Sequence, residues 1–142
     1  MPKPIYTCLW FENQAEEAAR FYCSVFPNSS ILNASPIVVN FTLNGTHIMA
    51  LNGRVPPYAF NESFSLVLPC DTQEEIDYYW NHLTGNGGKE SMCGWCTDKY
   101  GISWQVIPSM LGELMSDPEK GPRVMQAFLK MRKFDIETLK NA

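Results

Sequence analysis

The hydrophobic and polar positions of this chain follow one pattern twice, and the first copy fills the N-terminal third. Apolar residues run over 5–11, and a stripe with helical spacing follows at Ala15, Ala18, Ala19, Tyr22 and Phe26. Three runs rich in β-branched and aromatic residues come next: 30–34, 37–43 and 47–51. Asn44-Gly45 is the residue pair that a two-residue hairpin turn prefers. The order predicted for this part is βαβββ.

The same order returns in the second half. Residues 64–70 form an apolar run, and a second helical stripe follows at Ile76, Tyr79, Trp80 and Leu83. The turn formers of Asp98–Gly101 then separate two further strand-like runs, the second of which ends at Pro108. A repeat of this kind indicates two modules that pack as a pair.

Both predicted helices begin with the form of a capping box. In Asn13–Glu16 and in Asp71–Glu74 a short polar residue precedes a glutamate by three positions, so that each can satisfy a free backbone N–H. We therefore expect Asn13 to cap the first helix, and we expect the second helix to begin just after Asp71.

The pattern defines one α+β domain over residues 1–142, built from paired βαβββ modules that form a curved mixed sheet around a cavity. Its expected parts are a first module at about 4–52, a connector at about 53–62, a second module at about 63–108 and C-terminal helices at about 109–142. Those C-terminal helices need an apolar surface to lie on, either their own sheet or a second subunit. Together with open sheet edges, this need predicts a homodimer.

Composition narrows the class of protein. The chain has 142 residues, of which 45% are hydrophobic and 13% aromatic, which is ample for a packed core. Its net charge of -4 argues against binding to nucleic acid. Neither a signal peptide nor a membrane-spanning run is readable, so we expect a cytoplasmic protein that does not bind membranes and whose five cysteines are mostly reduced.

Several motifs, in order, resemble one family. They are Cys8–Ala18, Phe21-Tyr22, Val25–Asn28, Met49–Gly53, Cys93–Trp95 and Asp98–Gln105. They resemble the PhnB-like proteins of the glyoxalase/bleomycin resistance/dioxygenase (vicinal oxygen chelate) superfamily, many of which are labelled 3-demethylubiquinone-9 3-methyltransferase. The resemblance covers nearly the whole chain and implies the curved-sheet fold and a homodimer.

The resemblance also implies where a metal would sit. In metal-dependent members of the superfamily, histidines and glutamates on four strands hold a divalent ion, and the matching positions here are Tyr6, about Ala50, about Ser65 and Gln105. None is a carboxylate or an imidazole, so we expect no metal. No glycine-rich strand-to-helix loop for a methyl donor is readable either, and we expect no cofactor.

The same strands provide candidate ligand-binding residues. If Tyr6 lines the cavity, alternation along the strand brings Cys8 and Trp10 with it. The expected lining is Tyr6, Cys8, Trp10, Ala50, Ser65, Trp95 and Gln105. The set is apolar and aromatic with few polar groups, which is typical of a pocket for a small flat molecule, although the same side chains could simply fill the interior.

Two functions follow from this reading. One is metal-free binding of a small apolar or aromatic molecule; the other is catalysis on a hydrophobic or quinone-like substrate, including the methyl transfer implied by the family label. Cys93 and Cys96 have the spacing of a redox pair but precede a turn and a strand rather than a helix, which favours two unreactive thiols. His47 and His82 are interpreted as structural or solvated, with a general-base role kept open for His47.

Overall fold

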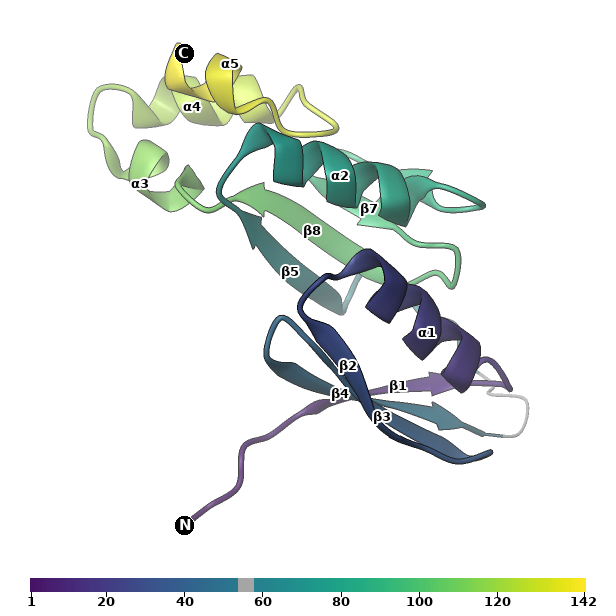
Figure 1. Cartoon of the computed structure of the whole chain (residues 1–142). Helices are drawn as coiled ribbons and strands as arrows, with labels where there is room; N and C mark the ends of the chain where they lie inside the picture. Colours follow the sequence, from purple (N-terminus) through teal and green to yellow (C-terminus); the bar gives the residue numbers. More distant parts are fainter. Residues whose placement is uncertain (54–57) are drawn as a thin grey trace. The chain divides into compact units, whose positions relative to one another are not determined.

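The computed structural model describes residues 1–53 and 58–142. The contacts divide the chain into two compact units, Met1–Ala59 and Phe60–Ala142, and each is described by itself. The predicted connector falls partly on residues 54–57, which lie outside the described residues. Figure 1 shows the elements of each unit.

The first unit is a four-stranded mixed sheet with one helix. Its elements are β1 (Thr7–Phe11), α1 (Ala15–Val25), β2 (Ser29–Ala34), β3 (Val38–Leu43) and β4 (Thr46–Asn52). The strand order is β1-β4-β3-β2, in which β1 is parallel to β4 and the other neighbours are antiparallel. Asn44 and Gly45 have φ values of 49° and 85°, as the predicted hairpin turn requires. The βαβββ order is therefore confirmed for this unit.

Helix α1 covers one face of this sheet with the predicted apolar stripe. Tyr22 is fully buried and stacks on Phe41 of β3 with ring centroids 6.2 Å apart. The predicted cap is wrong, because the side chain of Asn13 does not cap the helix. Asn52 at the end of β4 does so instead: its Oδ1 accepts a 2.9 Å hydrogen bond from the Ala15 N–H.

The second unit repeats the first and adds three helices. Its elements are β5 (Ser65–Cys70), α2 (Gln73–Thr84), β6 (Lys89–Glu90), β7 (Trp95–Thr97), β8 (Ser103–Pro108), α3 (Leu111–Ser116), α4 (Gly121–Phe128) and α5 (Ile136–Lys140). The strand order β5-β8-β7-β6 is the order of the first sheet, and β5 and β8 are again parallel. The fold is thus α+β with two βαβββ units, as predicted.

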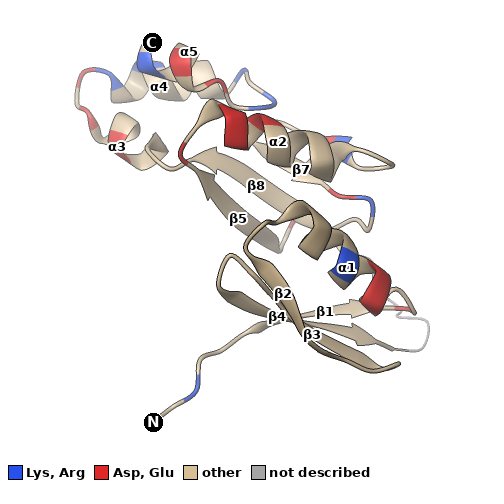
Figure 2. Ribbon diagram, in the orientation of Figure 1, with Lys and Arg blue, Asp and Glu red and all other residues tan. Residues whose placement is uncertain are grey.

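Helix α2 begins one residue later than the predicted capping box implies. Thr72 is the N-cap and accepts from the Glu75 N–H at 3.1 Å, and the Glu75 carboxylate accepts from the Asp71 N–H. Figure 2 shows carboxylates at this end of α2, where Glu74 and Glu75 face the positive end of the helix dipole. Charges of both signs are interspersed over the C-terminal helices in the same view.

The C-terminal segment finds its apolar cover within its own unit. Phe134 and Leu139 are buried. The Gln73 side chain of α2 donates to the Phe134 carbonyl at 2.9 Å and accepts from the Ile136 N–H at 2.8 Å. The sequence left two possible surfaces for this segment, its own unit or a second subunit, and for these residues the structure shows the first. The apolar stripe of this segment is therefore no longer an argument for a dimer.

Each helix that the structure describes is too short or too polar to cross a membrane.

Candidate functional site

The β7–β8 hairpin organises the second unit around the carboxylate of Asp98. This side chain is 2% exposed, and its Oδ1 accepts from the Tyr100 and Ile102 N–H groups at 2.9 and 3.1 Å. Its Oδ2 accepts from the Trp104 indole at 2.9 Å. Gly101 has φ 87° and completes the predicted turn. The turn therefore fixes the register of β8.

Strand β8 alternates between two faces, as the sequence predicts. Trp104 and Val106 are buried on the face that α2 covers. Ser103, Gln105 and Ile107 lie on the open face. The hairpin thus directs a serine and an amide away from the helix.

Three of the predicted site residues come together on this open face. Gln105 is paired with Trp95 on β7, and its Nε2 donates to the Ser65 hydroxyl on β5 at 3.0 Å. Because the Gln105 amide is already bonded to Ser65, it acts as a fixed polar group rather than a free one. Ser65, Trp95 and Gln105 therefore lie together on this face, and their part in binding stays a prediction.

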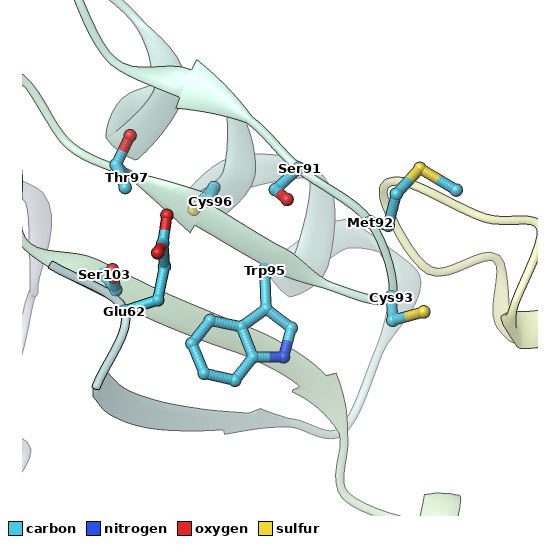
Figure 3. A pocket seen from close by; sticks show the side chains of 8 residues that line it. All are labelled: Glu62, Ser91, Met92, Cys93, Trp95, Cys96, Thr97 and Ser103. Atoms are coloured by element: carbon cyan, nitrogen blue, oxygen red, sulfur yellow. The ribbon is translucent and has the colours of Figure 1, made fainter. Parts of the chain in front are cut away.

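A pocket of about 320 Å³ opens beside Trp95 (Figure 3). Its lining residues are Glu62, Ser91, Met92, Cys93, Trp95, Cys96, Thr97 and Ser103. In Figure 3 the Glu62 side chain projects across the strands on the same side as the Trp95 indole. All described lining residues belong to the second unit.

The hydroxyl of Ser103 is the unusual group in this pocket. Ser103 is 1% exposed, and its Oγ has no hydrogen-bond partner among the described residues. A buried hydroxyl without a partner costs about 1–3 kcal/mol, so such groups are uncommon in folded proteins. A polar atom placed in the pocket could remove this cost.

Sequence reasoning found Trp95 but missed the other lining residues as a binding set. For Ser103 a signal existed, because alternation along the strand places it on the same face as Gln105. For Glu62 there was none, since it precedes β5 in a segment without periodic pattern.

The cysteine pair has no environment that would activate a thiol. Burial, and then the nearby carboxylates of Asp98 and Glu90, raise the pKa of Cys96 to about 12. Cys93 does not lie at the N-terminus of a helix, and its φ of 58° places it in a turn. Both features favour the interpretation of two unreactive thiols.

In the first unit, the predicted residues of β1 lie on the open face of their sheet. Cys8 and Trp10 are exposed and alternate with the buried Leu9 and Phe11. Trp10 lies against the backbone of Gly53, where a Cβ would overlap the indole. The strand therefore presents Cys8 and Trp10 on its open face and keeps Leu9 and Phe11 on the buried face.

The placement of Ala50 was wrong. Ala50 is paired with Leu9 and Val39, all three are buried, and they face α1 instead of the open side. The register differs by one residue from the prediction, and a shift of one residue moves a side chain to the other face of a strand.

His47 lies on the open face of the first sheet. It stacks on Tyr6 with ring centroids 4.1 Å apart, and its Nε2 hydrogen-bonds Asn40 Oδ1 at 2.8 Å. His82, in the second unit, is exposed and bonds the Tyr78 carbonyl through Nδ1 at 2.8 Å. These contacts account for both imidazoles as structural groups.

The residues at the four expected metal positions do not fit a divalent ion. Tyr6, Ser65 and Gln105 offer neutral oxygens, and Ala50 offers no ligand atom and faces the helix. Within residues 1–53 and 58–142, three His, Cys, Asp or Glu side chains nowhere gather in a way that could hold a metal. These four positions therefore lack the ligands that a divalent metal needs.

Comparison with known families assigns the chain. The family model for 3-demethylubiquinone-9 3-methyltransferase matches residues 3–107. This chain belongs to that family. Among curated proteins, no sequence matches it.

Solved structures of a PhnB protein and of glyoxalase/bleomycin resistance proteins share the fold. The PhnB protein of Bacillus cereus, whose assignment as a 3-demethylubiquinone-9 3-methyltransferase is provisional, is 34% identical over 75% of this chain and 99% of its own, with a TM-score of 0.68. A glyoxalase/bleomycin resistance protein/dioxygenase family enzyme of Burkholderia phytofirmans is 14% identical over 71% and 94% of the two chains, with a TM-score of 0.58. The fosfomycin resistance protein FosX of Listeria monocytogenes, in complex with Mn(II) and sulfate, is 14% identical over 80% and 94%, with a TM-score of 0.59. The chain thus has the glyoxalase/bleomycin resistance fold of PhnB-like proteins.

Proposed function

We propose that this PhnB-like protein binds a small molecule with an apolar or aromatic body and one polar group, in the pocket beside Trp95. The buried hydroxyl of Ser103, which has no partner among the described residues, carries this proposal, because it lines a pocket whose other walls include an indole and a thioether. Pockets of this composition bind the body of a ligand by apolar contact and orient it through a few polar groups.

The size of the pocket suits a ligand of one or two rings. Its volume of about 320 Å³ lies at the lower end of the range for small-molecule sites, which is roughly 300–1,000 Å³. Trp95 offers a flat face, and Met92 offers a side chain that adapts to irregular shapes. A flat ring placed against Trp95 would bring its substituents near Thr97 and Ser103, which are paired on adjacent strands.

Access to Ser103 requires a small movement of the side chains above it, because this residue is only 1% exposed. Glu62 and Met92 are the lining residues suited to such a movement, since both are exposed and have long side chains. Their shift would let a polar atom of the ligand reach the serine hydroxyl.

A second candidate is catalysis on a quinone-like substrate. The family description favours it, since it names a methyl transfer to a quinone precursor. Binding of S-adenosylmethionine together with a quinone would distinguish this function from binding alone.

We also propose a homodimer, because the open edges of the two sheets still need a cover. In the described parts of the two sheets, β2 and β6 are edge strands that carry unpaired backbone groups on one side. Sedimentation at micromolar concentration tests this, and a monomer would contradict it. The cytoplasmic location expected from the sequence is tested by cell fractionation.

The decisive experiment combines a ligand screen with two stability measurements. Thermal shift with aromatic compounds, quinones, S-adenosylmethionine and divalent metals identifies a binder, because a ligand that binds only the native state stabilises it. The Ser103→Ala variant should then weaken binding of that compound by about tenfold, through loss of one hydrogen bond. The free variant should be more stable than the wild type by about 1 kcal/mol, because a buried unpaired hydroxyl has been removed.

These opposite signs separate a binding role from a structural one. Ser116→Ala is the matched control, because its exposed hydroxyl bonds the Glu113 carbonyl outside the pocket. If Ser103→Ala destabilises the free protein and leaves ligand affinity unchanged, the proposed site is wrong.

A further inference from the structure

The charge of the pocket is carried by one residue. Glu62 is the single formally charged side chain among the eight described lining residues. The carboxylate is exposed, and among the described residues it forms no ion pair. A negative charge that is not neutralised at the mouth of an apolar pocket attracts a cation.

The wall next to this charge suits an organic cation rather than a metal ion. The indole face of Trp95 carries negative electrostatic potential, and a desolvated cation over such a ring gains about 2 kcal/mol or more. Met92 and the hydroxyl groups of Ser91 and Thr97 line the same pocket and are neutral. One carboxylate with these neighbours provides too few ligands for a divalent metal.

The charged side chains nearest to the lining residue Cys96 are also negative. Asp98 and Glu90 both raise the pKa of the lining residue Cys96, after the larger effect of burial. The carboxylates nearest to Cys96 thus have the same sign of charge as Glu62, although N–H donors already bond both of them.

Two lysines near the pocket carry the opposite charge. Their positions show that they reduce the negative potential of the pocket only weakly. Lys89 is in register with Thr97, but it lies exposed on the edge strand β6 and does not line the pocket. Lys99 has its Nζ 5.5 Å from the centroid of the Tyr100 ring and is also exposed. Exposed charges outside a pocket are screened by water and salt.

We propose that the pocket selects ligands that carry a protonated amine or another organic cation on an apolar ring, with Glu62 as the residue that determines this specificity. The inference rests on the proposed binding function and adds the charge of the ligand to it. In the bound state the ring lies on Trp95, the cationic nitrogen pairs with the Glu62 carboxylate, and Ser103 accepts an N–H of the amine.

Three probes of nearly equal shape test the charge preference: 1-naphthylmethylamine, 1-naphthalenemethanol and 1-naphthoate. At pH 7 they are cationic, neutral and anionic. Calorimetric titration of the full chain at physiological salt should show the amine binding about tenfold more tightly than the alcohol, and the naphthoate binding most weakly. Higher salt should reduce the difference between the amine and the alcohol.

The Glu62→Gln variant should bind the amine and the alcohol with equal affinity, with affinity for the alcohol unchanged. Glu113→Gln is the control, because it removes the same charge from an exposed position outside the pocket and should leave the tenfold preference intact. Lys89→Gln should leave the preference unchanged or increase it.

The outcomes separate the inference from the function on which it rests. Binding of the alcohol as tightly as the amine, or tighter binding of the naphthoate, overturns the charge preference while the binding function stands. Loss of the preference in Glu113→Gln as well as in Glu62→Gln would show that only net charge matters, and would also overturn it. Failure of all three probes to bind at millimolar concentration contradicts both proposals.

Discussion

The indole of Trp104 donates a 2.9 Å hydrogen bond to the carboxylate of Asp98, six residues earlier and on the other side of the β7–β8 turn. Both side chains are buried. The same carboxylate accepts two backbone N–H groups of the turn, so one side chain holds the hairpin that carries Trp95, Thr97 and Ser103.

Removing this carboxylate should destabilise the second unit severely. In Asp98→Ala the indole and two backbone N–H groups lose their acceptor, and we expect a loss of about 3 kcal/mol or more in the free energy of unfolding. Trp104→Phe removes only the indole donor, and should cost about 1–2 kcal/mol. Urea denaturation followed by circular dichroism measures both. Equal stability of wild type and Asp98→Ala would contradict this account of the hairpin.

Gly94 should not tolerate a side chain. Its φ is 80°, and a Cβ would lie 2.7 Å from Phe134 Cδ2 and 2.7 Å from the Val106 carbonyl oxygen. Gly94→Ala should therefore cost about 3 kcal/mol, from left-handed strain together with overpacking. Gly45→Ala is the control, because Gly45 has φ 85° but no atom within 4 Å of the added Cβ. It should cost only about 1 kcal/mol in thermal or urea unfolding.

The N-terminal cap of α1 is Asn52 in the structure, whereas the sequence predicted Asn13. In Asn52→Ala the Ala15 N–H loses its acceptor and the Pro36 carbonyl loses a donor. This variant should lose about 1–2 kcal/mol in the free energy of unfolding. Asn13→Ala should change the stability by less than about 0.5 kcal/mol, since Asn13 lies exposed outside the helix. The reverse order of the two effects would restore the capping box expected from the sequence.

Buried thiols should make the protein less stable at alkaline pH. Burial first, and nearby carboxylates second, raise the pKa of Cys70 and of Cys96 from 9.0 to about 12. Above pH 9 the unfolded chain loses these protons while the folded protein retains them, so the free energy of unfolding falls as pH rises from about 9 to about 12. Replacing both cysteines with alanine should flatten this decline in denaturation curves measured between pH 8 and 11.

The same two thiols should resist alkylation in the native protein. Iodoacetamide at pH 8, followed by peptide mass spectrometry, should modify the exposed Cys8 before Cys70 and Cys96. Rapid modification of Cys96 would contradict its burial and would reopen the redox interpretation.

Much of the fold was readable because its signals are local. The Asn44-Gly45 turn, the apolar stripe of α1 and the turn at Asp98 each depend on residues close in sequence, and each is confirmed. The helix cap was missed because Asn52 is distant in sequence from Ala15, and sequence reasoning chose the nearest polar side chain.

The site was readable only in part for a related reason. Alternation along β8 placed Gln105 correctly, because a buried turn fixes the register there. For Ala50 no such anchor was recognised, and an error of one residue moved it to the wrong face. That Ser103 is both buried and unpaired depends on neighbours from several strands, which periodicity cannot show.

The two hydrogen bonds between the Gln73 side chain and the backbone of Phe134 and Ile136 also constrain the order in which the chain can fold during synthesis. The strand pairs of the first sheet are complete once residue 52 has left the ribosome. The second sheet must wait for β8 to meet β5, and the Gln73 amide, which also donates to Asp77, lacks its two backbone partners until residue 136 has emerged. Synthesis therefore leaves the first turn of α2 without its contacts to the backbone of Phe134 and Ile136 until the C-terminal helices emerge.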